Sequence, residues 1–334
     1  MKAVGYYQSL PIDAEDSLID FTVPTPKAQG RDLLVAIKAI AVNPVDTKVR
    51  KNQPAEANHP IILGWDASGI VEAVGEKVSL FKPGDEVWYA GDRTRPGTNS
   101  EYHLVDERIV AKKPKSLTFQ HAAALPLTSL TAWELIFDRL QITSKEKGTV
   151  LITGAAGGVG SILVQILRKL TQLTIIGTAS RPESMTWVLN HGAHHVIDHS
   201  KDIKAQLDEI NIPQIDYVIS LTHSDIYAKT FAEVLKPQGK FALIDDPQNI
   251  DIKLFKWKCI SIHWELMFTR SMFKTPDMIK QHEILTQIAK LVDESQIKTT
   301  ISECLGCINA TNLKKAHALI ESGLARGKIV LEGF

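Results

Sequence analysis

The chain changes its hydrophobic pattern about one third of the way along. Before residue 120, short apolar runs stand between turn-forming residues, at 33–41, 70–74, 86–88 and 103–105. Apolar and β-branched runs bounded by Gly, Pro and Asp predict short strands. Between two of these runs lies KPGD at 82–85, a turn signal in which Pro presets one φ angle and Gly permits the other. This part therefore predicts a compact, loop-rich β domain.

From residue 149 onward, predicted strands and helices alternate strictly. The strands are expected at 149–153, 173–178, 195–197, 216–221, 240–244 and 259–264, with helices at 161–170, 182–190, 203–211 and 226–235. Such an alternation predicts a parallel sheet with helices on both faces. The first of these helices is apolar almost all round, which is typical of a buried helix.

After about residue 268 the alternation stops. A helix at 276–292, a short strand at 299–302, a helix at 312–322 and a last strand at 328–331 are expected there. A chain of 334 residues exceeds what one hydrophobic core usually supports. The simplest layout is an α/β fold in which a doubly wound domain interrupts a β-rich domain. The expected boundaries are 1–124 and 267–334 for the β-rich domain and 125–266 for the doubly wound one.

Composition narrows the class of protein. Lys and Arg total 38, as do Asp and Glu, and no basic arm or stripe is visible, which argues against nucleic-acid and anionic-membrane partners. No stretch approaches the ~20 apolar residues of a membrane helix, and the first residues do not resemble a signal peptide. The three cysteines are too few for a disulfide framework. We therefore expect a cytoplasmic protein.

The strongest chemical signal is LITGAAGGVGS at 151–161, between the first strand and the first helix of the alternation. Three glycines spaced three apart allow a tight turn, a close approach to a pyrophosphate, and close packing of helix on strand. The helix N-terminus then directs N–H groups and a positive dipole at the anion. The turn predicts a dinucleotide site formed by Gly154, Ala156, Gly157, Gly158, Val159 and Gly160.

The end of the second strand predicts which dinucleotide binds. An NAD site places Asp or Glu there, about 20 residues beyond the glycines, to bind the ribose 2′-hydroxyl. This chain has no acid in that region before Glu183 and has Ser180 and Arg181 instead. A guanidinium and a hydroxyl suit a 2′-phosphate, so we expect NADPH. The alternative is that Arg181 is an ordinary solvated loop residue.

Further motifs are spread along the chain. They are VNPVD at 42–46, GWDASGIVEAVG at 64–75, PGDEV at 83–87, ALP at 124–126 with TA at 131–132, and GKIVL at 327–331. Together with the glycine turn, they resemble the medium-chain dehydrogenase/reductase superfamily along nearly the whole chain. The likeness is strongest to its quinone-oxidoreductase branch and to bacterial proteins labelled zinc-type alcohol dehydrogenase-like. The resemblance implies a GroES-like catalytic domain, a Rossmann NADP-binding domain and a homodimer.

The resemblance also assigns roles to residues outside the glycine turn. It places Asn43 and Thr131 near the nicotinamide, and Asp46 near the substrate cleft. Asn43 would hold the carboxamide of the cofactor or polarise an oxygen of the substrate. Lys328, in the closing motif, is expected to bind the cofactor. No side chain stands out as the general acid, which leaves solvent as a source of the proton.

The resemblance raises the question of zinc at GWDASG. Zinc-dependent alcohol dehydrogenases have Cys at the position of Asn43, and Gly-His-Glu where this chain has Gly64, Trp65 and Asp66. A catalytic zinc needs about three N, S or O protein ligands. Asn43 and Trp65 offer no suitable donor, and no cysteine precedes Cys259, so we expect no metal. Trp65 either fills the space of the metal or packs beside the cleft.

Zinc independence shapes the functional prediction. Without a Lewis acid to polarise a carbonyl, interconversion of alcohol and ketone is less favoured than reduction of an activated acceptor. The sequence therefore predicts an NADPH-dependent oxidoreductase that transfers hydride to a quinone or an α,β-unsaturated carbonyl. Two alternatives stay open: a zinc-dependent alcohol dehydrogenase, and a non-catalytic NADPH-binding redox sensor.

An aromatic and Met-rich region at 257–273 has two interpretations that do not exclude each other. Its large residues are Trp257, Trp264, Met267, Phe268, Met272 and Phe273. They could pack at a domain junction or a subunit interface. They could also form an apolar wall for a substrate, since ligand pockets favour domain clefts.

Overall fold

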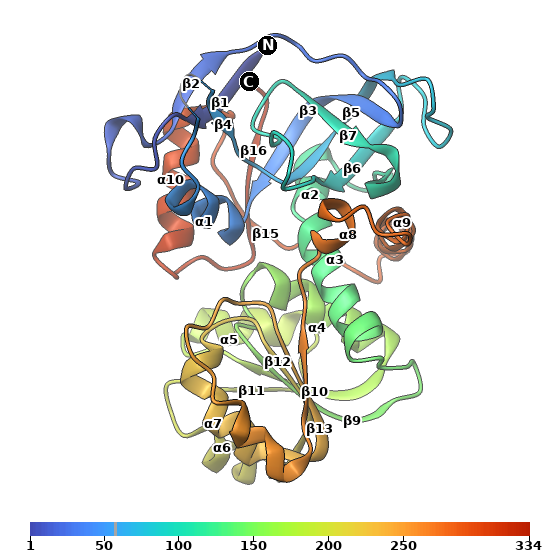
Figure 1. Cartoon of the computed structure of the whole chain (residues 1–334). Helices are drawn as coiled ribbons and strands as arrows, with labels where there is room; N and C mark the ends of the chain where they lie inside the picture. The colour runs from blue at the N-terminus through green and yellow to red at the C-terminus, as the bar shows by residue number, and fades with distance from the viewer. Residues whose placement is uncertain (57–58) are drawn as a thin grey trace. The chain divides into compact units, whose positions relative to one another are not determined.

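A computed structural model describes residues 1–56 and 59–334 and divides the chain into two compact units. Unit 1 comprises Met1–Leu130 and Phe268–Phe334, and unit 2 comprises Thr131–Met267, coloured green to orange in Figure 1. A β-rich domain interrupted in sequence by a parallel-sheet domain is the predicted fold class, which is confirmed. The expected boundaries at 124/125 and 266/267 stay a proposal.

Unit 1 is built on two sheets of mainly antiparallel strands. The larger has the order β15-β16-β3-β5-β6-β8, with β7 also paired to β3, and the smaller has the order β2-β1-β4. The strands are β1 (Lys2–Tyr6), β2 (Ile19–Thr22), β3 (Asp32–Val42), β4 (Ile61–Ile62), β5 (Asp66–Val74), β6 (Glu86–Ala90), β7 (Tyr102–Asp106), β8 (Val110–Lys112), β15 (Ile301–Cys304) and β16 (Lys328–Glu332).

One pairing in the larger sheet decides where the candidate site forms. The last strand, β16, runs antiparallel to β3, with Ile329 opposite Val42 and Leu331 opposite Ile40. Lys328, the first residue of β16, therefore comes next to Asn43, which directly follows β3. Two residues that are 285 positions apart in the chain become neighbours through backbone pairing alone.

Short helices complete unit 1. They are α1 (Pro44–Asn52), α2 (Phe119–Ala123), α8 (Thr269–Met272), α9 (Lys280–Asp293), α10 (Ala310–Glu321) and the 3-10 turns η1 (Glu15–Ser17) and η2 (Glu107–Ile109). The helix expected at 276–292 begins only at Lys280. The reason is local: Thr275 Oγ1 donates to the Asp277 carboxylate, and Met278 N–H donates to Thr275 O, which makes a turn.

Unit 2 has a six-stranded parallel sheet with the order β11-β10-β9-β12-β13-β14. The strands are β9 (Lys147–Thr153), β10 (Gln172–Thr178), β11 (His195–Ile197), β12 (Ile215–Ser220), β13 (Leu235–Leu243) and β14 (Ser261–Trp264). The chain moves outward from β9 in one direction to β11, then returns to β12 and continues to β14. The strand order thus reverses between β9 and β12, where open α/β sheets bind their ligands.

The helices of unit 2 follow its strands in the predicted alternation. They are α4 (Gly158–Leu170), α5 (Pro182–Asn190), α6 (Ile203–Glu209), α7 (Ser224–Val234), the π-helix η3 (Glu134–Arg139) and the 3-10 helix η4 (Ile252–Lys258), while α3 (Pro126–Trp133) crosses from unit 1 into unit 2. Helix α4 is buried from Gly160 to Leu167, as its apolar sequence predicts. The described part of the chain contains no helix with the length and apolarity needed to cross a membrane.

Candidate functional site

The glycine turn of unit 2 joins β9 to α4 with the backbone that the sequence predicts. Gly154 has a φ of 66°, in the left-handed region that glycine enters without steric strain. Gly157 N–H donates to Gly154 O at 3.0 Å, which closes the turn. Gly157 is the N-cap of α4 and no described side chain caps that terminus, so the first N–H groups of the helix are open to an anion.

Gly160 lets α4 lie against the turn. A Cβ atom at this position would be 2.5 Å from Gly154 O and 2.6 Å from Ala155 Cα, both backbone atoms that cannot rotate away. A Cβ at Gly157 would be 3.3 Å from Gly154 O, a much milder approach. Gly160 therefore has a packing role, whereas Gly157 has more room around it.

Ser180 and Arg181 lie just beyond the end of β10. The preceding residue, Ala179, donates its N–H to Ile197 O at 3.0 Å, which ties this segment to β11. Arg181 has extended backbone as the N-cap residue of α5, and Pro182 follows at the first helical position. The Arg181 side chain is 40% exposed, with Nε 3.9 Å from the exposed Glu183 carboxylate. Such a long, solvated ion pair is weak.

Hydroxyl groups at the carboxyl ends of β9 and β12 and at the start of α7 form a network with the carboxylate of Asp245, just after β13, which the sequence interpretation missed. Thr153 Oγ1 lies 3.1 Å from Ser220 Oγ, and Ser224 Oγ lies 2.8 Å from Ser220 Oγ. Ser224 also donates its hydroxyl and its N–H to the carboxylate of Asp245. The sequence does contain a signal for this network, because Thr153 ends β9 and Ser220 ends the neighbouring β12. The network holds three strand ends together beside the glycine turn.

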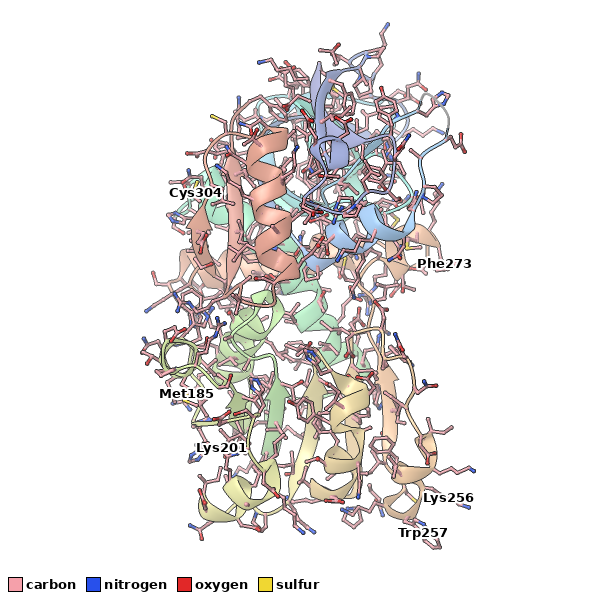
Figure 2. All side chains as sticks on the ribbon, turned by 90° about the vertical axis from the view of Figure 1, so that its left-hand side faces the viewer. Met185, Lys201, Lys256, Trp257, Phe273 and Cys304 are labelled. Carbon is pink, nitrogen blue, oxygen red and sulfur yellow. The ribbon has the colours of Figure 1, made fainter. Side chains whose placement is uncertain are left out.

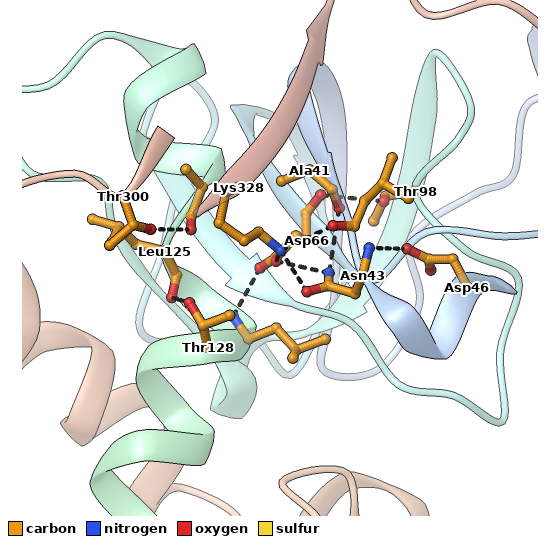
Figure 3. A network of polar contacts seen from close by, with 12 residues as sticks. Ala41, Asn43, Asp46, Asp66, Thr98, Leu125, Thr128, Thr300 and Lys328 are labelled. Carbon is orange, nitrogen blue, oxygen red and sulfur yellow. Dashed lines mark hydrogen bonds and ion pairs between the residues drawn. The ribbon is translucent and has the colours of Figure 1, made fainter. Parts of the chain in front are cut away.

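Unit 1 contains a buried polar centre made of Asn43, Asp66 and Lys328 (Figure 3). Asn43 Nδ2 donates to Asp66 Oδ2 at 2.9 Å and to Ala41 O at 3.3 Å. The Lys328 ammonium donates to Asn43 Oδ1, to Asp66 Oδ2 at 3.0 Å and to Val42 O at 3.2 Å. Asp66 is fully buried and Lys328 is 3% exposed. The two predicted site residues Asn43 and Lys328 are thus in direct contact.

Asp66 receives a third donor from another segment of unit 1. Leu127 N–H, in the first turn of α3, donates to Asp66 Oδ1 at 2.8 Å. Burial raises the pKa of the Asp66 carboxyl, and the Lys328 ammonium and the N–H donors of Asn43 and Leu127 oppose that rise. The carboxylate therefore connects β5, β16 and the start of α3.

Asp46 lies on the other side of Asn43. Its Oδ2 accepts the backbone N–H of Asn43 at 2.5 Å, which together with the Asn43 side chain forms a capping box at the start of α1. Asp46 is 1% exposed, and its Oδ1 has no hydrogen-bond partner among the described residues. Burial raises the pKa of this carboxyl to about 7, although the Asn43 N–H and the Lys328 charge lower it. Burial therefore favours the protonated form of this carboxyl more than in an ordinary aspartate.

Trp65 is an interior residue of unit 1. It is 2% exposed, its indole N–H donates to Asp92 O at 3.3 Å, and its ring meets the edge of Phe268 with centroids 6.1 Å apart. The preceding residue, Gly64, has a φ of 100°, which turns the chain into β5. Trp65 thus packs in the interior of unit 1, and its position relative to a substrate cleft stays a prediction.

The remaining residues singled out from the sequence lie in different surroundings. Thr131 is buried in α3 as the first residue of unit 2, whereas Asn43 and Asp46 belong to unit 1. In the aromatic region at 257–273, Met267 and Phe268 are buried, and the large exposed side chains are Trp257, Trp264, Leu266 and Phe273. The catalytic and cofactor roles of all these residues stay proposals.

The donor set of the polar centre does not suit zinc. Asn43 offers an amide, Trp65 an indole and Asp66 a carboxylate that already accepts three hydrogen bonds. Zinc in proteins is held by thiolates, imidazoles and carboxylates. Across residues 1–56 and 59–334, no group of three or more His, Cys, Asp and Glu side chains is arranged to hold a metal ion.

Two family models match the chain. One, described as an alcohol dehydrogenase GroES-like domain, matches residues 29–115, within unit 1. The other, described as a zinc-binding dehydrogenase, matches residues 191–331, which include most of the unit 2 sheet and the return to unit 1.

Known proteins resemble the chain along its length. A Rhizobium etli protein of known crystal structure, provisionally named a zinc-dependent alcohol dehydrogenase, is 55% identical with a TM-score of 0.96, covering 100% of this chain and 98% of its own. A zinc-type alcohol dehydrogenase-like protein of Staphylococcus aureus is 39% identical and covers 99% of both chains. The quinone oxidoreductase of Lama guanicoe is 32% identical over 70% of this chain and 69% of its own.

Proposed function

Because this chain belongs to the medium-chain dehydrogenase/reductase superfamily of oxidoreductases, we propose that it reduces a quinone or an α,β-unsaturated carbonyl with NADPH and without zinc. The observation that carries the proposal is the polar centre of unit 1. At the positions where zinc enzymes of the superfamily place ligands, the chain has an amide and a carboxylate that bind its own lysine ammonium. The quinone oxidoreductase among its relatives supports the choice of acceptor.

NADPH is supported by the residues of unit 2. When bound, the cofactor supplies a hydride from C4 of its nicotinamide. The glycine turn and the N-terminus of α4 offer N–H groups for the pyrophosphate, and the end of β10 offers Ser180 and Arg181 for the 2′-phosphate. No carboxylate stands there to favour the ribose hydroxyl of NAD, because the first acid after β10 is Glu183, inside α5.

Asn43, Asp46 and Thr131 remain the proposed catalytic residues. Both amide hydrogens of Asn43 are engaged, one at 2.9 Å with Asp66 and the other at 3.3 Å with Ala41 O. The longer bond is the one that Asn43 can exchange for an oxygen of the substrate or of the carboxamide. Burial raises the pKa of Asp46 to about 7, which suits proton exchange after hydride transfer.

We also propose that the protein forms a homodimer through unit 2. Strand β14 is at the edge of the parallel sheet, where β13 is its one partner among the described strands. Trp264 on this strand and Leu266 just after it are about half exposed, and Trp257 before it is 91% exposed at the surface of the unit (Figure 2). An exposed edge strand with large apolar side chains is a ready template for pairing with another chain.

The test is a screen of NADPH oxidation with quinones, enones and aldehydes, using protein treated with a chelator. We expect turnover with quinones or enones and weaker or no turnover with simple aldehydes and ketones. Turnover that appears only after zinc is added back, with zinc bound at about one ion per chain, would instead establish the alcohol dehydrogenase. NADPH binding with no turnover of any acceptor would establish the redox sensor.

The cofactor assignment is tested separately with Arg181→Glu. A hydrogen bond to a charged group contributes about 1.5–3 kcal/mol, so NADPH should bind at least ~10-fold more weakly while NADH affinity changes little. Arg93→Glu, a charge reversal at an exposed arginine of unit 1, is the matched control. Unchanged NADPH affinity in Arg181→Glu would show that the 2′-phosphate assignment is wrong.

A further inference from the structure

The Lys328 side chain is unusual because it is a charged group buried with all of its donors used. An ammonium has three N–H donors. In this structure they meet Val42 O, Asn43 Oδ1 and Asp66 Oδ2, so none is left for another ligand. The acceptors belong to β3, to the residue after it and to β5.

The position of the ammonium follows from the fold of unit 1. The antiparallel pairing of β16 with β3 sets Lys328 beside Val42 and Asn43. Asp66 enters from β5, which pairs with β3 through Ile40 and Ala67. Three strands of one sheet thus converge on a single cation, and the geometry does not depend on unit 2.

Asp66 needs this cation. Its carboxylate has no exposure to solvent, and an isolated buried carboxylate is strongly unfavourable unless it is paired and hydrogen-bonded. Asn43 and Leu127 supply neutral donors, but Lys328 supplies the only full positive charge within ion-pair distance among the described residues. The ammonium therefore stabilises the ionised carboxylate.

We propose that the Lys328 ammonium is the resident cation of this centre and prevents zinc from binding there, although the chain belongs to a family named for zinc. A Zn²⁺ ion at this place would need Asn43 Oδ1 and Asp66 Oδ2, which the ammonium already occupies. It would also lie beside a like charge in a buried environment, where such repulsion is poorly screened. The inference assigns Lys328 an internal role in place of the cofactor contact expected from resemblance. It goes beyond the proposed function and requires no knowledge of the substrate.

The experiment compares wild type with Lys328→Met, Asp66→Asn, the double variant, and Lys82→Met as a control. Lys82 is an exposed lysine of the same unit. Each purified protein is incubated with zinc, dialysed, and measured for metal content by plasma mass spectrometry. Its thermal unfolding is then followed with and without zinc, and its NADPH affinity is measured by fluorescence titration. None of these readouts requires turnover, so they separate this inference from the proposed reaction.

We expect three results if the ammonium is the resident cation. Wild type retains well under one zinc per chain after dialysis, and zinc does not raise its Tm. Lys328→Met lowers the Tm by more than about 5 °C or prevents folding, whereas Lys82→Met leaves the Tm unchanged. The double variant recovers a large part of the Tm lost in Lys328→Met, because no unpaired charge stays buried. The double variant binds NADPH within about threefold of the affinity of Asp66→Asn.

Each opposite result would overturn the proposal. About one zinc per chain in wild type would show that the ammonium does not exclude the metal. A Lys328→Met variant as stable as wild type, or a double variant less stable than both single variants, would show that the ammonium does not serve Asp66. A loss of NADPH affinity of tenfold or more between Asp66→Asn and the double variant, with both folded, would make Lys328 a cofactor ligand.

Discussion

The substitution Gly160→Ala separates two effects that oppose each other in sign. Gly160 is near the start of α4, where a change to Ala improves helix propensity by about 0.5–1 kcal/mol. Propensity alone therefore predicts a more stable protein. Packing predicts the reverse, because the added Cβ would lie 2.5 Å from Gly154 O and 2.6 Å from Ala155 Cα.

The packing effect should be the larger. These distances are about 1 Å shorter than the 3.5–4.0 Å at which non-bonded carbon atoms attract each other. Both contacts are with backbone atoms of the turn after β9, so relief requires α4 to move away from the sheet. Overpacking of this kind costs about 1–3 kcal/mol, and subtracting the propensity gain leaves a net loss of up to about 2.5 kcal/mol.

The assay is urea unfolding of Gly160→Ala beside wild type, with Gly157→Ala as the matched control. Gly157 has ordinary extended backbone, and its Cβ would approach Gly154 O only to 3.3 Å. We expect Gly160→Ala to unfold at lower urea and Gly157→Ala to unfold near wild type but bind NADPH more weakly. A Gly160→Ala protein more stable than wild type would refute the argument that α4 packs on the turn through this glycine.

Two further predictions concern acid stability and assembly. Burial lowers the pKa of His103 and His317 to about 3, well below the unfolded value of 6.5, so each histidine should make stability fall as the pH drops from 6.5 toward 3. Buried Asp46, with its pKa raised to about 7, acts in the opposite sense over part of this range. Urea unfolding as a function of pH should show a shallower fall for His317→Leu than for wild type or His121→Gln, and an equal fall would contradict the assignment. Trp264→Glu should convert a dimer to a monomer in sedimentation velocity. Ile226→Glu, which changes an exposed residue of α7, should leave the dimer intact. A Trp264→Glu protein that is still a dimer would show that β14 is not the interface.

Unit 2 could be predicted closely because its sequence signals are local. Helix α5 and strand β11 have the bounds expected from the sequence, since Pro182 sets one helix start and the apolar residues of β11 stand between polar ones. The π-helix η3 cannot be recognised from the sequence, because residue spacing does not distinguish an i to i+5 ladder from an i to i+4 ladder. Its discovery required the backbone geometry itself.

Unit 1 was harder to predict because its partners are distant in sequence. Strand β1, KAVGY, was not expected, since it contains a glycine and lacks a clear alternation. In the structure Gly5 faces the backbone of Ile61 so closely that a Cβ would overlap it. That contact exists only once β4 has paired with β1, so the reason for the glycine is tertiary and no local pattern reveals it.

The polar centre shows the same limit at the candidate site. The sequence indicated that Asn43 and Trp65 are poor metal ligands, but it could not show what replaces the metal. The resemblance assigns Lys328 to the cofactor site, which stays a prediction, and the distance of Lys328 from Asp66 in the chain conceals their pairing. The β3–β16 pairing makes the connection. An acid that sits at a metal-ligand position can thus be retained for its negative charge, provided that another strand supplies a permanent cation.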